Sequence, residues 1–186
     1  HRHRGEYGLA QAYSEQANKT FAQTGDHRGQ IRSFYNLTCV FLDQGLLAKS
    51  LQTNLAGLAL ADAGHDRKWQ AFLNTQLGIT STHLGEYARA RQYLREGLRW
   101  AVASGDQPSV GHAYSGIGDL YRAQGQWAEA QRNYEQDAAN YQRMRDEGGI
   151  LYEDINIGDM LVAGKRMANQ HSIGFLSVQY AVYLIG

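Results

Sequence analysis

One internal repeat constrains this chain more than any other feature of its sequence. A shift of 40 superposes four aliphatic residues, Leu37, Leu77, Ile117 and Ile157. The same shift superposes three glycines, Gly45, Gly85 and Gly125, and four small residues, Ala48, Ala88, Ala128 and Ala168. A unit of this length that recurs along a whole chain is typical of arrays in which similar supersecondary units stack on one another.

Each unit contains the pattern of two helices joined by a glycine turn. In residues 112–138, Tyr114, Ile117 and Tyr121 recur at helical spacing before Gly125, and Trp127 and Tyr134 do so after it. Side chains three to four positions apart share one face of a helix, so each set lies on one face, and Trp127 and Tyr134 are expected to be largely buried between hairpins. Glycine adopts the left-handed conformation that ends helices, and a single proline in 186 residues leaves the helices uninterrupted. The sequence therefore predicts an all-α fold.

The pattern predicts nine helices in one domain that spans residues 1–186. Their expected ranges are 6–24, 28–44, 46–63, 67–84, 86–104, 108–124, 126–146, 150–163 and 166–185. They form a half repeat, 1–26, and the repeats 27–65, 66–106, 107–148 and 149–186. The breaks between repeats are assigned to Gly25, Gly64, Gly105 and Gly148, and the intervals between them grow along the chain. This uneven spacing indicates that the connection between repeats is fixed less tightly than the turn inside each hairpin.

Both ends of the chain depart from the repeat. Residues 5–7 match 85–87, where a second helix starts, so the first repeat lacks its first helix. We expect the chain to be a fragment of a longer protein; a simple capping helix is the alternative. In the last copy, Gln170 and Gly174 replace residues of the pattern, and the final helix is unusually apolar for a terminal cap. This apolar character suggests either more chain after Gly186 or a surface for self-association.

Charge, apolar stretches, cysteine content and motifs exclude several classes of function. The 18 basic and 18 acidic residues balance, which argues against direct nucleic-acid binding. The apolar stretch from Ile173 to Ile185 is too short to span a membrane, so no membrane partner is expected. The single cysteine, Cys39, fits a reducing compartment, and we expect a cytoplasmic protein. No phosphate-binding loop, HExxH or CxxC motif occurs, so we expect no catalytic residue, no cofactor and no metal site.

The repeat resembles the tetratricopeptide repeat (TPR) family. One copy carries Leu77, Gly78, Gly85, Tyr87, Ala90 and Leu94, and the next carries Ile117, Gly118, Tyr121, Gly125, Trp127, Ala130 and Tyr134. The 40-residue period is similar to the long variety found in LGN/Pins-type adaptors and in the arrays of bacterial MalT-like regulators. The resemblance implies a right-handed superhelical solenoid of antiparallel hairpins. It implies an architecture rather than a reaction.

The resemblance also implies a binding groove along the first helix of each hairpin. The groove positions that it implies are Arg32, Tyr35, Asn36, Cys39, Phe72, Thr75, Gln76, Ile79, His112, Ser115, Asp119, Arg122, Tyr152, Ile155, Asn156 and Asp159. Amides among them are expected to hydrogen-bond a peptide backbone, and aromatics to anchor apolar side chains. The alternative is that the aromatics complete the packing between helices. Because only Arg32 and Arg122 are basic, a clamp for a terminal carboxylate is not expected.

Two functions fit these features. The first is a non-enzymatic scaffold that binds a protein or peptide segment in the groove. The second is the ligand- or peptide-sensing array of a larger signalling or transcriptional regulator. An enzyme is not expected, because no catalytic constellation is present.

Overall fold

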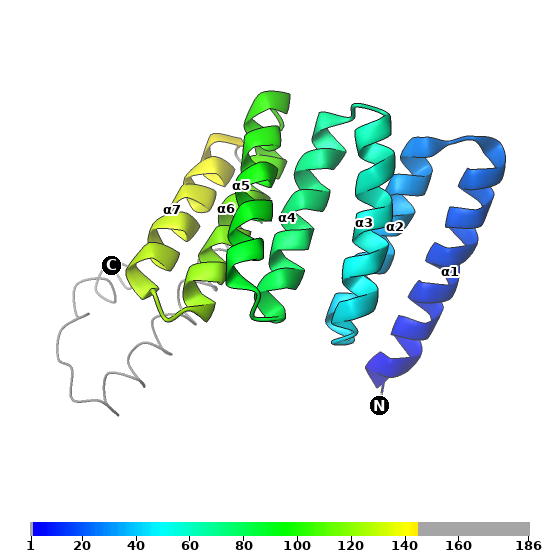
Figure 1. The fold of residues 1–186 in the computed structure, drawn as a ribbon, viewed down its shortest axis with the longest axis horizontal. Helices are drawn as coiled ribbons and strands as arrows, with labels where there is room; N and C mark the ends of the chain where they lie inside the picture. Colours follow the sequence, from blue (N-terminus) through cyan, green and yellow to red (C-terminus); the bar gives the residue numbers. More distant parts are fainter. Residues whose placement is uncertain (1, 145–186) are drawn as a thin grey trace.

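The computed structural model describes the backbone of residues 2–144 and the side chains of residues 7–140. This part of the chain consists of seven α-helices arranged in a row in chain order (Figure 1). Their bounds are α1 Arg2–Thr24, α2 His27–Asp43, α3 Leu47–Ala63, α4 Arg67–His83, α5 Tyr87–Ser104, α6 Gln107–Ala123 and α7 Trp127–Met144. Neighbours along the chain pack against each other, and α4 also packs on α6.

The structure confirms an all-helical fold for the described residues. The predicted helices that correspond to α2 to α7 agree with them closely at both ends, whereas α1 begins at Arg2 rather than at residue 6. The two remaining predicted helices, 150–163 and 166–185, lie outside the described residues, and with them the repeat 149–186. We call α2, α4 and α6 first helices, because each begins a hairpin. We call α1, α3, α5 and α7 second helices.

The connections between repeats are as evenly spaced as the hairpin turns. Residues with positive φ occur at one constant interval, in the order Gly25, Gly45, His65, Gly85, Gly105 and Gly125. The predicted break at Gly64 is therefore wrong by one position, because Gly64 has φ −86° and His65 takes the left-handed conformation with φ 52°. The prediction that connections between repeats are spaced less regularly than hairpin turns depended on Gly64, and it is wrong for the connections at residues 25, 65 and 105. A left-handed turn residue thus follows each helix at the same interval, both within and between hairpins.

Aspartates start all three first helices. The side chains of Asp26, Asp66 and Asp106 accept hydrogen bonds from backbone N–H groups of the first helical turn, as helix-capping residues do. Two of these caps also join neighbouring hairpins, because Arg28 pairs with Asp66 at 2.9 Å and Lys68 pairs with Asp106 at 2.7 Å. Burial alone would raise the pKa of Asp106, but hydrogen bonds from Lys68 and Ser109 hold that pKa below its usual value. Second helices α3 and α5 have no such cap.

The core is divided into small clusters between neighbouring helices, which is how stacked repeats bury apolar surface. Leu94 is fully buried and Tyr134 is 1 % exposed. Each lies against a glycine of its own first helix, Gly78 and Gly118 respectively. The predicted burial of Tyr134 is thus confirmed, whereas Trp127 packs on the same cluster as Tyr134 but remains half-buried.

Candidate binding surface

A row of ring contacts crosses all three first helices. Tyr35 on α2 meets Phe72 on α4 edge to face, with ring centroids 6.0 Å apart. Phe72 in turn meets the ring of His112 on α6 at 5.4 Å. All three residues are half-buried, so the row retains solvent-accessible surface. Three of the positions that the resemblance implied therefore lie side by side in the structure.

The first part of this row also has a packing role. Trp69 lies 6.0 Å from both the Tyr35 and the Phe72 rings. Tyr35 and Trp69 pack against a buried cluster that contains Ile31 and Leu73. Aromatic pairs in such offset arrangements stabilise a fold beyond the area that they bury. The aromatic groups thus join the first two hairpins as well as presenting a surface.

Two of the implied groove residues belong to the interior instead. Thr75 is fully buried and Gln76 is 4 % exposed, so neither side chain faces a ligand in this structure. For Thr75 the reason is the close approach of helices on both sides of α4, because Gly97 of α5 and Gly116 of α6 both lie against it. Because Gln76 is buried, its amide does not reach a surface where it could hydrogen-bond a peptide in this structure.

The remaining positions on α2 and α4 differ in exposure. Arg32 and Asn36 are exposed, and the Arg32 guanidinium lies 6.0 Å from the centre of the Phe21 ring. Cys39 and Ile79 are half-buried. Burial raises the pKa of the Cys39 thiol, which keeps it protonated at neutral pH and makes it a poor nucleophile.

Charges on α6 are largely satisfied within the protein. Arg122 pairs with Asp119 at 2.9 Å, and the Tyr134 hydroxyl donates to Asp119 Oδ1 at 2.8 Å. Burial lowers the pKa of His112 to about 4, so the imidazole is neutral at pH 7. Ser115, the fourth position on this helix, is half-buried. The surface formed by Tyr35, Phe72 and His112 is consequently uncharged at neutral pH.

Four implied positions, Tyr152, Ile155, Asn156 and Asp159, lie outside the described residues. Within the described part, no group of three or more His, Cys, Asp or Glu side chains is placed to hold a metal ion. In the same part of the chain, no helix is both long enough and apolar enough to cross a membrane.

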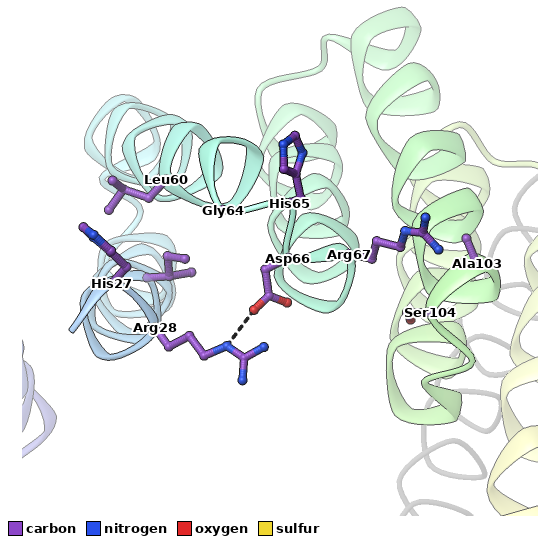
Figure 2. Close-up of a pocket in the computed structure, with 10 residues that line it drawn as sticks. His27, Arg28, Leu60, Gly64, His65, Asp66, Arg67, Ala103 and Ser104 are labelled. Carbon is purple, nitrogen blue, oxygen red and sulfur yellow. Dashed lines mark hydrogen bonds and ion pairs between the residues drawn. The ribbon is translucent and has the colours of Figure 1, made fainter. Parts of the chain in front are cut away.

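The structure also contains a cleft that sequence reasoning missed. It has a volume of about 510 Å³ and lies where α2 and α4 begin and α3 and α5 end (Figure 2). Its walls are His27, Arg28, Ile31, Leu60, Gly64, His65, Asp66, Arg67, Ala103 and Ser104. The available sequence signal was the basic pair at the start of two successive first helices, His27-Arg28 and Arg67-Lys68. The cleft itself depends on the spacing of four helix ends, which no local pattern specifies.

Comparison with known proteins supports the same architecture. Residues 69–143 match the sequence profile of the tetratricopeptide repeat family. The fold is similar to the crystal structure of BtubC (BKLC) from P. vanneervenii, with a TM-score of 0.68 and 16 % sequence identity over 95 % of this chain and 79 % of that chain. No curated protein sequence matches the chain. The profile match supports tetratricopeptide repeats within residues 69–143, and the structural likeness supports a shared helical fold.

Proposed function

We propose that this chain is a non-enzymatic, cytoplasmic scaffold that binds a segment of a partner protein along its first helices. Tetratricopeptide repeats generally mediate protein–protein interaction. The observation that carries the proposal is the continuous row from Tyr35 through Phe72 to His112, which gives three hairpins a common, partly exposed apolar surface. We propose that the array is a right-handed superhelix and that the inner surface of its curve contains this row.

The chemistry of this surface favours an uncharged partner segment. Next to the rings, exposed Asn36 offers both a donor and an acceptor to a peptide backbone, and each such hydrogen bond contributes roughly 1 kcal/mol net. Arg122 is already paired with Asp119, and His112 is neutral. Binding that depends on buried apolar area and amide hydrogen bonds should vary little with salt concentration. Neither nucleic acid nor a membrane is part of this proposal.

Site-specific photocrosslinking tests the proposal. A photoreactive residue replaces Asn36, the exposed residue that follows Tyr35 in the chain, and in a second protein it replaces Gln52, which is also exposed and lies on second helix α3. Because both side chains are exposed, neither replacement should disturb the fold. We expect defined protein partners to be crosslinked at residue 36 and not at residue 52, with the same yield at low and high salt. Equal crosslinking at both positions would place binding elsewhere on the molecule.

A comparison of binding affinities then tests the row itself. A Tyr35→Ala, Phe72→Ala double variant, checked for unchanged helicity, should lose affinity for a segment identified by crosslinking. The control is Leu55→Ala, which removes a 41 % exposed apolar side chain from α3 without touching the row. If the double variant and the control bind equally well, the aromatic row serves packing alone.

The cleft at the helix ends supports a second candidate, a small-ligand-sensing array within a larger regulator. Its volume of about 510 Å³ falls in the range of small-molecule sites. Arg28 in its wall is paired with Asp66, which leaves Arg67 as the cation that would favour an anionic ligand. An increase in melting temperature with small anionic metabolites that is lost in Arg67→Ala would support this candidate. No increase across such a set would argue against it.

A further inference from the structure

The contact between α3 and α4 differs in chemistry from the equivalent contact one hairpin later. Between α5 and α6 lies a buried apolar cluster of Ala90, Leu94 and Leu120. A shift of 40 residues gives the equivalent set between α3 and α4, which we call the polar contact: Ser50, Asn54 and Thr80. All three of these polar side chains are fully buried. The first and second hairpins therefore meet through polar groups where the second and third meet through apolar ones.

Hydrogen bonds hold the polar contact together. The hydroxyl oxygens of Ser50 and Thr80 lie 3.2 Å apart across it, and Asn54 Nδ2 donates to the Leu73 carbonyl at 2.9 Å. Asn54 Oδ1 and Thr38 Oγ1 are buried and have no hydrogen-bond partner among the described residues. If α3 and α4 separate here, water can replace both hydrogen bonds and supply the missing ones. Opening the polar contact is therefore easier than opening the apolar cluster, whose exposure to water is wholly unfavourable.

The two ends of this interface differ. The polar contact lies toward the hairpin turns, because Ser50 is in the first turn of α3 and Thr80 is in the last turn of α4. Toward the connection between the two helices, a buried apolar cluster is formed by Ile31, Ala61 and Leu73. Figure 1 shows α3 and α4 joined at that end. The interface thus has a cohesive apolar end beside the connection and a second end whose contacts water can replace.

The connection itself contains a strained residue. His65 has φ 52°, a conformation that a side chain disfavours, so a change in its backbone angles relieves strain. The equivalent connection between α5 and α6 contains Gly105, which adopts φ 70° freely. Hinges are formed by a few residues at the ends of elements that take up such changes. Strain and polar contact therefore coincide at the α3–α4 interface, and the α5–α6 interface has neither at the equivalent positions.

We propose that the α3–α4 interface is a hinge, at which the first hairpin tilts away from the second by opening the polar contact and pivoting on the apolar cluster near His65. The apolar α5–α6 interface keeps the second and third hairpins together as one body. Tyr35 packs against the cluster on the pivot side, so the tilt leaves its ring in contact with Phe72. The hinge goes beyond the proposed function, since it changes the curvature of the array without breaking the row of rings.

Distances between pairs of spin labels test the hinge in the full chain. Each protein carries Cys39→Ser and two labelled cysteines at exposed, equivalent positions on successive second helices. The label pairs replace Gln52 and Gln92 near the polar contact, Ala63 and Ala103 at the pivot end, and Gln92 and Arg132 across the apolar α5–α6 interface. We expect the distance distribution of the first pair to be about twice as wide as those of the other two, because only the first pair spans the opening end of a hinge.

A matched variant makes the result specific to the polar contact. It gives the first interface the residues of the second at the equivalent positions, and it includes a glycine because Leu94 lies against Gly78: Thr38→Gly, Ser50→Ala, Asn54→Leu and Thr80→Leu. The first distribution should narrow to the width found across the α5–α6 interface, and the other two should not change.

Three results would overturn the hinge. Equal widths for all three label pairs in the unaltered interface would show that the first hairpin moves no more than the third, and this comparison decides even if the matched variant does not fold. A folded variant whose first distribution stays broad would show that the polar contact is not the cause. A second pair as broad as the first would show that the hairpins separate along their whole length and do not pivot.

Discussion

Gly118 lies directly against the ring of Tyr134, and a Cβ atom at residue 118 would overlap three carbon atoms of that ring. Helix α6 can approach α7 this closely only because residue 118 has no side chain. Gly78 has the same relationship to Leu94 one hairpin earlier. The large side chain on the second helix and the glycine on the first helix therefore form one packing unit, which recurs in successive hairpins.

Gly118→Ala should destabilise the protein by about 1–3 kcal/mol, because Tyr134 is buried and has little space to move. The control is Gly8→Ala in α1, where an added Cβ meets nothing within 4 Å. Alanine favours helix over glycine, so this control should stabilise by up to about 1 kcal/mol. Urea unfolding of both variants measures the two effects. If Gly118→Ala also stabilised the protein, the result would contradict the close contact between Gly118 and the Tyr134 ring.

His65→Gly should stabilise the protein by about 0.5–1 kcal/mol, because His65 has φ 52°, a conformation that a side chain disfavours and glycine adopts freely. The mirror experiment is Gly105→Ala, with φ 70° at the equivalent position of the next connection, which should destabilise by about 1 kcal/mol. Thermal or urea melts measure both changes. Opposite signs are the diagnostic result, and two changes of the same sign would contradict the turn assignment.

His112 should make stability depend on pH in a defined window. Its pKa falls from 6.5 to about 4 on folding because burial disfavours the charged ring. Between these values the unfolded chain binds the proton and the folded chain does not, so stability is full above pH 6.5 and falls as the pH drops toward 4. The loss attributable to this residue is up to roughly 3 kcal/mol.

The matched variant for this prediction is His112→Phe, which keeps a ring beside Phe72 but cannot take up a proton. Between pH 6.5 and pH 4 the urea midpoint of the wild type should fall more steeply than that of the variant. A wild type that loses no more stability than the variant would show that the imidazole ionises as readily in the folded protein as in the unfolded chain.

Tyr134→Ala should cost about 3–5 kcal/mol, the range for a fully buried aromatic side chain. Trp127→Ala should cost less, about 2–3 kcal/mol, since the indole is only half-buried in the same cluster. In a stack of this kind each loss should spread to the adjacent hairpin, which hydrogen exchange can map. A larger loss for Trp127 than for Tyr134 would reverse the burial order found here.

Local features of the fold could be predicted from the sequence, and features that depend on the approach of separate helices could not. Turn glycines and apolar spacing defined the bounds of α2 to α7, because helix ends are determined by the residues that form them. The left-handed residue at position 65 was missed, since histidine gives no turn signal beside Gly64. Thr75 and Gln76 were expected to line the groove, and the burial of Thr75 follows from glycines on two other helices. The cleft likewise depends on how the ends of four separate helices approach one another.

The even series of turns has a consequence for how such a chain can change its length during evolution. A duplication or loss of the segment that starts at Asp66 and ends at Gly105 carries the cap, the turns and both partners of contacts such as Thr75 with Gly97. The copied segment would join its neighbours without a shift of register. An exchange of a single helix would instead place Asp137, which has Gly111 as its partner, against the larger Ala71. The heritable unit is therefore the hairpin that begins at a capping aspartate, and single helices are not interchangeable.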